Sequence, residues 1–269
     1  MDIVLFEPFA QAWGDKDAFD EVAKISGEVV RHKEGRKTQR FEFGDAVYYV
    51  KHHSGIGWGE YLKNLSQLKK PVIGARNEWE AINCLHQLNI HTLTPVAFGE
   101  RGVNPASQES FLITRELTGV LSLAKYAETW PQQPPVFTER FHLIHAVADI
   151  ARQIHQAGIN HRDLYICHFL LKQEGKDLRN PILHLVDLHR AQIRNKVPFR
   201  WLVKDVASIY FSAMDIGLTK RDILRFMRRY FDRPLRTVLA EETRLLKAIQ
   251  IRAERLYRRD FKRAAPQFW

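Results

Sequence analysis

One stretch constrains the fold of this chain more than any other, and it runs from His161 through Arg162 and Asp163 to Leu171. A helical pattern ends just before it at Gly158, and its last three residues are apolar and predict a short strand. A second apolar run ends in Asp187, 24 positions after Asp163. In phosphotransfer enzymes a His-Arg-Asp loop supplies a base and a later Asp binds magnesium. The layout therefore predicts a phosphotransfer site.

Each of these acids also has an ordinary structural interpretation. His-Arg-Asp recurs by chance in unrelated proteins, and an Asp after an apolar strand often caps a turn. Here the motif lies between a predicted helix and a predicted buried strand, which is the context that a catalytic loop requires. This context favours a catalytic base at Asp163 and a metal ligand at Asp187.

A lysine within an apolar strand is the next candidate. Lys51 ends the run from Val47 to Lys51, and burial of its ammonium is costly unless anions neutralise it. Alone, such a lysine more often protects a sheet edge. Nucleotide phosphates and one helix carboxylate would satisfy it. Glu78 at the start of a predicted helix is the expected partner, and Glu80 is the second choice.

The hydrophobic pattern predicts a β-rich N-terminal part and a mostly helical C-terminal part. Strands are expected at 28–31, 38–43, 47–51, 97–99 and 111–114. Helices are expected at 1–25, 61–70, 77–88, 122–130, 138–155 and 204–214, followed by two or three more, with N-caps at Thr138 and Thr219. We therefore expect an α+β, two-lobed fold, with residues 1–117 as a nucleotide-binding lobe and 118–269 as a catalytic lobe.

The charge distribution points to an acidic partner. The formal net charge is +10, and the last 52 residues carry 15 Lys and Arg against 6 Asp and Glu. This excess predicts contact with nucleic acid, an anionic membrane or a phosphorylated lipid, although a merely solvated basic helix is an equal alternative. Two cysteines give neither a disulfide framework nor zinc spacing. No signal peptide or membrane span is expected, and a cytoplasmic location fits.

These residues together are typical of a protein-kinase-like fold, and the chain resembles the lipopolysaccharide core heptose(I) kinase family (WaaP/RfaP) nearly from end to end. The most specific stretches are 157–163, 167–171, 186–192, 210–212 and 216–223. The resemblance implies transfer of phosphate from ATP, with Mg²⁺, to the first heptose of the lipopolysaccharide inner core, at its 4-hydroxyl. It also implies a lipid A-core glycolipid acceptor, a position at the inner face of the inner membrane, and acyl carrier protein as a partner; nucleic acid is not expected.

The resemblance assigns roles by matching position. Lys51 would bind the ATP phosphates, Glu78 would orient Lys51, Asp163 would be the base and Asp187 the metal ligand. The supporting residues would be His161, Arg162 and Asp205 around the loop, and Glu116 and Leu117 at the adenine hinge.

Several departures from the wider kinase pattern affect these expectations. No Gly-x-Gly-x-x-Gly precedes Lys51. His168 replaces the expected second metal ligand, and magnesium prefers oxygen. Only 18 positions separate Asp187 from Asp205, which leaves little room for a peptide platform. A sugar acceptor is therefore favoured over a protein kinase. A non-catalytic module that docks acidic lipid is a third alternative, disfavoured because Lys51, Glu78 and both acids are retained together.

Overall fold

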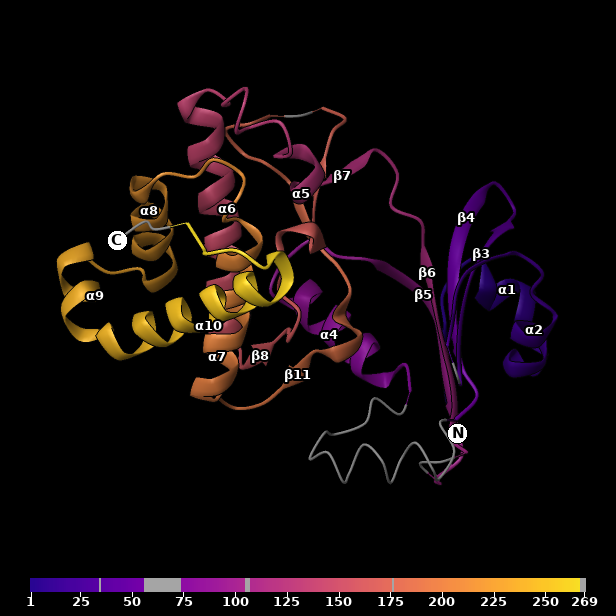
Figure 1. Ribbon diagram of the computed structural model, residues 1–269. Helices are drawn as coiled ribbons and strands as arrows, with labels where there is room; N and C mark the ends of the chain where they lie inside the picture. Colours follow the sequence, from indigo (N-terminus) through magenta and orange to yellow (C-terminus); the bar gives the residue numbers. More distant parts are fainter. Residues whose placement is uncertain (34, 56–73, 105–106, 176, 267–269) are drawn as a thin grey trace. The chain divides into compact units, whose positions relative to one another are not determined.

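The computed structural model describes residues 1–33, 35–55, 74–104, 107–175 and 177–266. The chain forms two compact units, one of Met1–Cys84 with Leu93–Thr118 and one of Leu85–Thr92 with Gly119–Trp269. Strands dominate the first unit and helices the second (Figure 1). The predicted α+β class is therefore confirmed.

The first unit is built on an antiparallel sheet in the order β1-β5-β6-β4-β3-β2. Its strands are β1 (Asp2–Leu5), β2 (Glu28–Lys33), β3 (Arg36–Phe43), β4 (Ala46–His53), β5 (Thr94–Arg101) and β6 (Glu109–Arg115). Its helices are α1 (Phe9–Trp13), α2 (Ala18–Lys24) and the start of α4 (Arg76–Gln87). The five strands and the helix 77–88 expected from the sequence are confirmed.

The two faces of this sheet are covered by different helices, which sets the environment of Lys51. An aromatic cluster around the buried Phe9 fills the face under α1 and α2. On the other face Trp79 of α4 stacks on Phe98, with 5.0 Å between ring centroids. Leu112 is the register partner of both Phe98 and Lys51. Because paired residues share a face, Lys51 faces α4.

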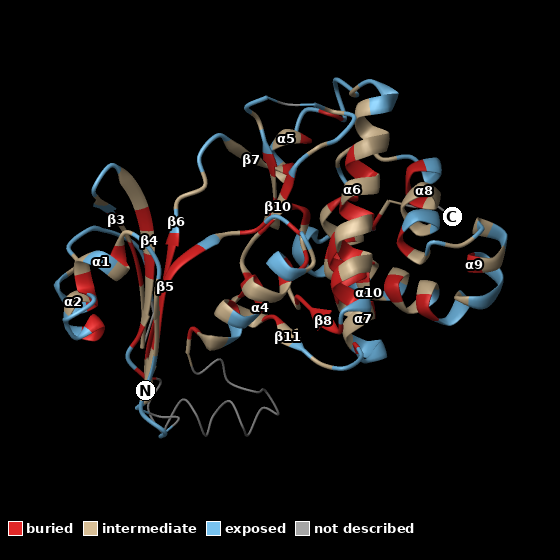
Figure 2. Ribbon diagram, turned by 180° about the vertical axis from the view of Figure 1, so that it is seen from behind, coloured by how far each residue is buried: buried red, intermediate tan, exposed pale blue. Residues whose placement is uncertain are grey.

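The second unit contains most of the helices and two small sheets, with the orders β10-β9-β7 and β11-β8. Its elements are β7 (Val120–Ser122), α5 (Leu123–Tyr126), α6 (Phe137–Gln156), β8 (Ile159–Asn160), η1 (Ile166–His168), β9 (Phe169–Lys172), β10 (Leu183–Leu185), η2 (Leu188–Arg190), β11 (Gln192–Ile193), α7 (Phe199–Ser212), α8 (Lys220–Phe231), α9 (Leu235–Glu241) and α10 (Thr243–Phe261). Buried residues line the inner sides of α6 and α7 (Figure 2).

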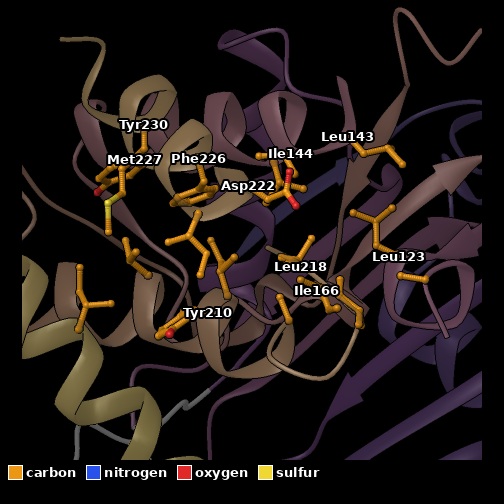
Figure 3. A pocket seen from close by; sticks show the side chains of 18 of the residues that line it. Leu123, Leu143, Ile144, Ile166, Tyr210, Leu218, Asp222, Phe226, Met227 and Tyr230 are labelled. Carbon is orange, nitrogen blue, oxygen red and sulfur yellow. The ribbon is translucent and has the colours of Figure 1, made fainter. Parts of the chain in front are cut away.

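An apolar pocket lies among α5, α6, α7, α8 and α10 of this unit. Leu123, Ile144 and Ile166 line it from one side, and Met227 and Phe226 of α8 point into it (Figure 3). Its lining is almost wholly aliphatic and aromatic. The core of the second unit is therefore open to an apolar guest at this point.

Three helix predictions are wrong in their extent. Residues 1–25 begin with β1, since Val4 pairs with Phe98 at the sheet edge and this pairing overrides the helical pattern. The helix expected at 122–130 is only α5, because the chain leaves the helix at the C-cap Ala127 and residues 127–130 form turns. The helix expected from 204 starts at Phe199, and its first turn carries basic side chains that suggested a loop.

The two predicted N-caps have different outcomes. Thr219 caps α8 in a capping box with Asp222, as predicted. Thr138 is not a cap, because α6 already begins at Phe137 and its N-cap position, Val136, makes no side-chain bond. The helix expected at 61–70 lies outside the described residues.

Candidate active site

The loop that carries Asp163 starts directly after β8 and is anchored by Asp205 of α7. Asp205 accepts the backbone N–H of His161 at Oδ2, 2.7 Å away, and that of Arg162 at Oδ1, 2.8 Å away. The Asp205 carboxyl is fully buried. Hydrogen bonds that a buried carboxylate accepts from N–H groups are stronger than hydrogen bonds between neutral groups. They fix the backbone immediately before Asp163.

Three backbone positions around this loop lie in the left-handed region. Arg162 has φ +74° and Asp187 has φ +65°, which costs a non-glycine residue about 1–2 kcal/mol. Gly158, with φ +77°, makes the turn into β8, and a Cβ there would lie 1.7 Å from the Arg194 carbonyl oxygen. Strained residues of this kind persist only where the surrounding contacts fix them, and they cluster at functional sites.

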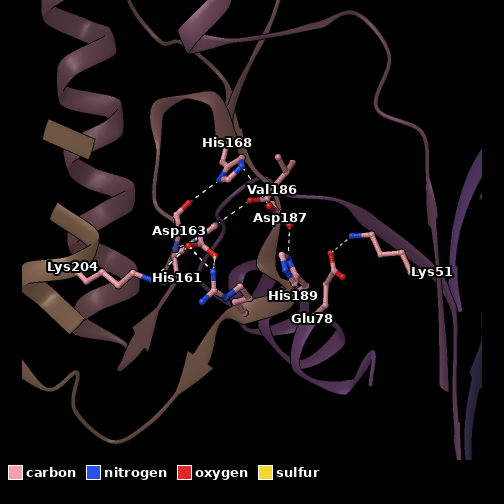
Figure 4. Close-up of polar contacts among 10 residues, drawn as sticks. Lys51, Glu78, His161, Asp163, His168, Val186, Asp187, His189 and Lys204 are labelled. Atoms are coloured by element: carbon pink, nitrogen blue, oxygen red, sulfur yellow. Dashed lines mark hydrogen bonds and ion pairs between the residues drawn. The ribbon is translucent and has the colours of Figure 1, made fainter. Parts of the chain in front are cut away.

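His161 connects the loop to the segment that ends in Asp187. Its Nε2–H donates to the Val186 carbonyl at 3.0 Å, and its Nδ1 accepts the Asp163 N–H at 3.3 Å (Figure 4). Burial lowers the pKa of this fully buried imidazole. The neutral ring, with its proton on Nε2, satisfies both partners. A single side chain thus couples the backbones of the two candidate catalytic acids.

Asp187 is flanked by two histidines. His189 Nδ1–H donates to its Oδ1 at 2.5 Å, and His168 Nε2 lies 3.4 Å from its Oδ2. The other His168 nitrogen, Nδ1, donates to the Asp163 carbonyl at 2.7 Å. Burial alone would lower the pKa of His168, but hydrogen bonds with Cys167 and the Asp163 carbonyl outweigh it and raise the pKa to about 9.

The side chains around Asp187 limit which metal ion could bind there. Among the described residues, no group of three or more His, Cys, Asp or Glu side chains could bind a metal ion. Magnesium, however, needs only one or two carboxylates when substrate phosphates and water supply its other oxygens. Asp187 fits that requirement. His168 uses Nδ1 for the Asp163 carbonyl, so only Nε2, which faces Asp187, could bind a metal, and magnesium prefers oxygen.

Asp163 lies among cations. Nη1 of Arg190 contacts both of its oxygens, at 3.0 and 2.8 Å, and Lys204 Nζ of α7 lies 3.5 Å from Oδ1 (Figure 4). Asp163 and Lys204 are each 15% exposed and Arg190 is 37% exposed. Burial lowers the pKa of Lys204, which the Asp163 charge partly offsets.

In the first unit, Lys51 of β4 binds Glu78 of α4. The two charged atoms are 2.5 Å apart, and the side chains are 16% and 2% exposed. The alternative partner, Glu80, is half-exposed and faces Arg76 instead. The sequence-based choice between the two glutamates therefore agrees with the geometry, whereas the role of the pair in nucleotide binding stays a prediction.

The predicted hinge residues follow β6 in the same unit. The backbone N–H of Glu116 donates to the Val47 carbonyl at 2.9 Å. Its carboxylate accepts bonds from Arg40 and Tyr49, and the Arg40 bond lowers the pKa of Glu116. The side chain of Glu116 thus links the end of β6 to the interior strands β3 and β4. Adenine recognition would fall to the Glu116 carbonyl and the Leu117 N–H.

Comparison with known proteins gives a consistent result over almost the whole chain. The family model of the lipopolysaccharide kinase (Kdo/WaaP) family matches residues 20–230. The chain belongs to this family. Its members are kinases, so the chain is an enzyme of the phosphotransferase class, and its fold is protein-kinase-like, as the sequence predicted.

Individual relatives of the Kdo/WaaP family agree with this assignment. The lipopolysaccharide core heptose(I) kinase WaaP of Pseudomonas aeruginosa is 49% identical over 263 residues, which cover 96% of this chain and 97% of the relative. WaaP of Escherichia coli K12 is 47% identical, with the same two coverages. A solved structure, WaaP in complex with acyl carrier protein, matches with a TM-score of 0.84 and 44% identity, over 96% of this chain and 100% of that one.

Sequence reasoning did not single out two residues that contact Asp163. Arg190 lies in the matched stretch 186–192, and Lys204 directly precedes the anchoring Asp205. A wider count of charges near the loop could have found Lys204, since α7 returns to the loop at Asp205. Nothing in the local pattern predicts the Arg190–Asp163 contact, because it depends on the turn at η2.

The basic C-terminal part exposes cationic side chains on two helices. On α8, Arg225 binds Asp222 and Arg229 binds Asp149, each at 2.7 Å. Lys220, Arg221 and Arg228 of the same helix are also exposed. On α10, the exposed Arg244, Lys247, Arg255 and Arg258 share one side, with the spacing i, i+3, i+11, i+14. None of the helices that the structure describes is long and apolar enough to span a membrane.

Proposed function

We propose that this kinase transfers the γ-phosphate of ATP to the first heptose of the lipopolysaccharide inner core, at its 4-hydroxyl. The observation that carries the proposal is 49% identity over nearly the full length of a relative named as heptose(I) kinase. The anchored loop of the second unit supports it, because Asp163 directly follows two backbone groups fixed by Asp205.

In this proposal Asp163 accepts the proton of the attacking hydroxyl. A base must lie within hydrogen-bond reach of that proton, and rigid support keeps it there. The Asp205 anchor and the His161 bridge provide the support from two directions. Lys204 Nζ lies 3.5 Å from Asp163 Oδ1, and in this proposal its ammonium stabilises negative charge on the transferring phosphoryl group.

Asp187 would bind one Mg²⁺ ion, which when present neutralises charge on the nucleotide phosphates. His168 is then a positioning group for the Asp163 carbonyl rather than a ligand. In the first unit, Lys51 would bind the phosphates while Glu78 fixes the direction of its ammonium. The hinge backbone at Glu116 and Leu117 would recognise adenine.

Acyl carrier protein is the proposed protein partner. The related structure contains that protein. An acyl carrier protein presents an acidic surface and an acyl chain, which suit a basic chain with an apolar pocket. We also propose a peripheral position at the inner face of the inner membrane, where the lipid A-core glycolipid acceptor would be met.

Turnover of ATP with purified core acceptor, with peptide and with buffer alone tests this function, and mass spectrometry of the product identifies the hydroxyl. Asp163→Ala and Asp187→Ala should each lose nearly all transfer. Only Asp187→Ala should lose magnesium-dependent ATP binding. Equal ATP and magnesium binding by both variants would remove the metal role from Asp187, and transfer to peptide alone would reject the sugar acceptor.

A further inference from the structure

The surroundings of Asp163 contain more positive charge than the catalytic acids neutralise. Five cationic side chains of the second unit gather around this loop: Arg162, Arg190, Arg194, Arg200 and Lys204. Asp163 contacts Arg190 and Lys204 directly, whereas Asp205 uses both oxygens for backbone N–H groups and acts on Arg162 and Lys204 only through its charge. A local excess of this kind favours binding of an anion.

Arg162 and Arg194 form no ion pair with an acid among the described residues. Arg194 donates to two neutral oxygens, those of Asn160 and Gln192, at 2.6 and 2.7 Å. Arg162 and Lys204 lie over the ring of Trp201, at 4.9 and 5.7 Å from its centroid. In the described part of the chain, Nε of Arg162 and the indole N–H of Trp201 are buried without a hydrogen-bond partner. Burial and the nearby charges of Arg190 and Arg194 lower the pKa of Arg162.

Arg190 also blocks access to the candidate base, Asp163. Its Nη1 lies within 3.0 Å of both Asp163 oxygens, where the acceptor hydroxyl has to approach. The contact uses one nitrogen of the guanidinium, so the bidentate geometry that makes such pairs strong is not reached. Arg190 is also more exposed than Lys204, the other side chain that contacts Asp163, at 37% against 15%. Arg190 can therefore release Asp163 and bind another anion in its place.

We propose that Arg190, with Arg194 beside it, forms a subsite for a second acidic group of the acceptor saccharide, a carboxylate or a phosphate. An acidic group bound there draws Arg190 away from Asp163 and frees the base. This inference rests on the proposed function and adds a specificity rule: acceptors with an acidic group near the reacting sugar are preferred. An acceptor can shift Arg190 only by its differential affinity for the released state, and a neutral acceptor has none.

The test crosses variants of Arg190 with acceptors that differ in charge. The variants are Arg190→Gln, the conservative Arg190→Lys, and Arg233→Gln as the matched control, since Arg233 is 36% exposed and pairs with acids of α9 and its C-cap. The acceptors are the core glycolipid, the same glycolipid with its carboxyl groups reduced to alcohols, the same glycolipid with its phosphates removed, and a neutral heptose glycoside. Thermal unfolding of each variant verifies that it is folded.

Wild type should lose activity on whichever modified acceptor lacks the acidic group that binds Arg190. Arg190→Gln should lose about 10- to 100-fold in kcat/KM on the unmodified glycolipid, the range for a hydrogen bond to a charged group. On the neutral glycoside it should equal or exceed wild type, because nothing blocks Asp163. Arg190→Lys should restore part of the preference, and Arg233→Gln should match wild type on all four acceptors.

Equal losses by Arg190→Gln on acidic and neutral acceptors would overturn the inference, and so would no loss on either. Hydrolysis of ATP by water separates this outcome from failure of the proposed function. Water carries no acidic group, so Arg190→Gln should hydrolyse ATP faster than wild type even if the core glycolipid is not the acceptor. Unchanged hydrolysis in that case would refute the block of Asp163 by Arg190.

Discussion

Replacement of Asp205 by asparagine tests the anchor of the catalytic loop. Asp205 is fully buried and accepts the N–H groups of His161 and Arg162 at 2.7 and 2.8 Å. Asparagine keeps one acceptor oxygen but turns an NH₂ group toward the other N–H. One charge-assisted bond, about 1.5–3 kcal/mol, is lost, and the remaining bond becomes a neutral one. We expect Asp205→Asn to lower the free energy of unfolding by about 2–4 kcal/mol.

The same substitution should act on catalysis through position alone, since Asp205 is fully buried and accepts backbone N–H groups of the loop. A displacement of about 1 Å at a catalytic group can cost about 100-fold in rate. We therefore expect kcat to fall by that order while the KM for ATP changes much less. Urea unfolding followed by fluorescence gives the free energy, and initial rates with saturating ATP give kcat.

Asp215→Asn is the control for this experiment. Asp215 is 42% exposed and accepts the Tyr257 hydroxyl at 2.8 Å, in the same unit. Asp215→Asn should lower the free energy of unfolding by less than about 1 kcal/mol, because exposed ion pairs contribute little to stability. If Asp205→Asn resembled Asp215→Asn in both stability and kcat, the loop would not depend on this anchor and the argument for it would fail.

Three further predictions concern other parts of the chain. Lys51→Met and Glu78→Gln should each weaken ATP binding, and a double-mutant cycle should show coupling; purely additive losses would remove the pairing. Replacing Arg255 and Arg258 of α10 by Gln should weaken binding to anionic vesicles by about 1 kcal/mol each at low salt, with no change on neutral vesicles, measured by sedimentation; equal losses on both vesicle types would argue against charge-driven docking. Gly158→Ala should lower thermal stability by more than the about 1–2 kcal/mol of its left-handed backbone, owing to the clash with the Arg194 carbonyl; a neutral effect would contradict the backbone geometry.

The sequence predicted those features whose cause is local. Alternation of apolar residues was enough to predict β3 and β4, and the Thr219–Asp222 capping box marked the start of α8. The Lys51–Glu78 pair also followed from the sequence, because a buried ammonium needs a carboxylate and the helix that starts nearby carries only two. Such inferences need no knowledge of distant segments.

Features set by distant segments could not be predicted. The first strand depends on pairing with β5, about ninety positions away, and its own residues favoured a helix. The basic sequence before Lys204 suggested a loop, whereas Arg200 lies on the first turn of α7, with its guanidinium 4.9 Å from the centroid of the Trp201 ring. The ion pair of Arg229 with Asp149 likewise depends on where α6 packs against α8.

Hydrogen bonds within the second unit connect the two candidate catalytic acids, Asp163 and Asp187. His161 donates to the Val186 carbonyl beside Asp187 and accepts the N–H of Asp163, while Asp205 fixes the His161 backbone. His168 adds a second link, from the Asp163 carbonyl to the Asp187 carboxylate. Because both Arg162 and Asp187 adopt left-handed backbone conformations, neither would keep its place without these bonds. Loss of the His161 ring should therefore move base and metal ligand together, whereas the Arg190 contact, which is exposed and uses a single nitrogen, can change without disturbing either.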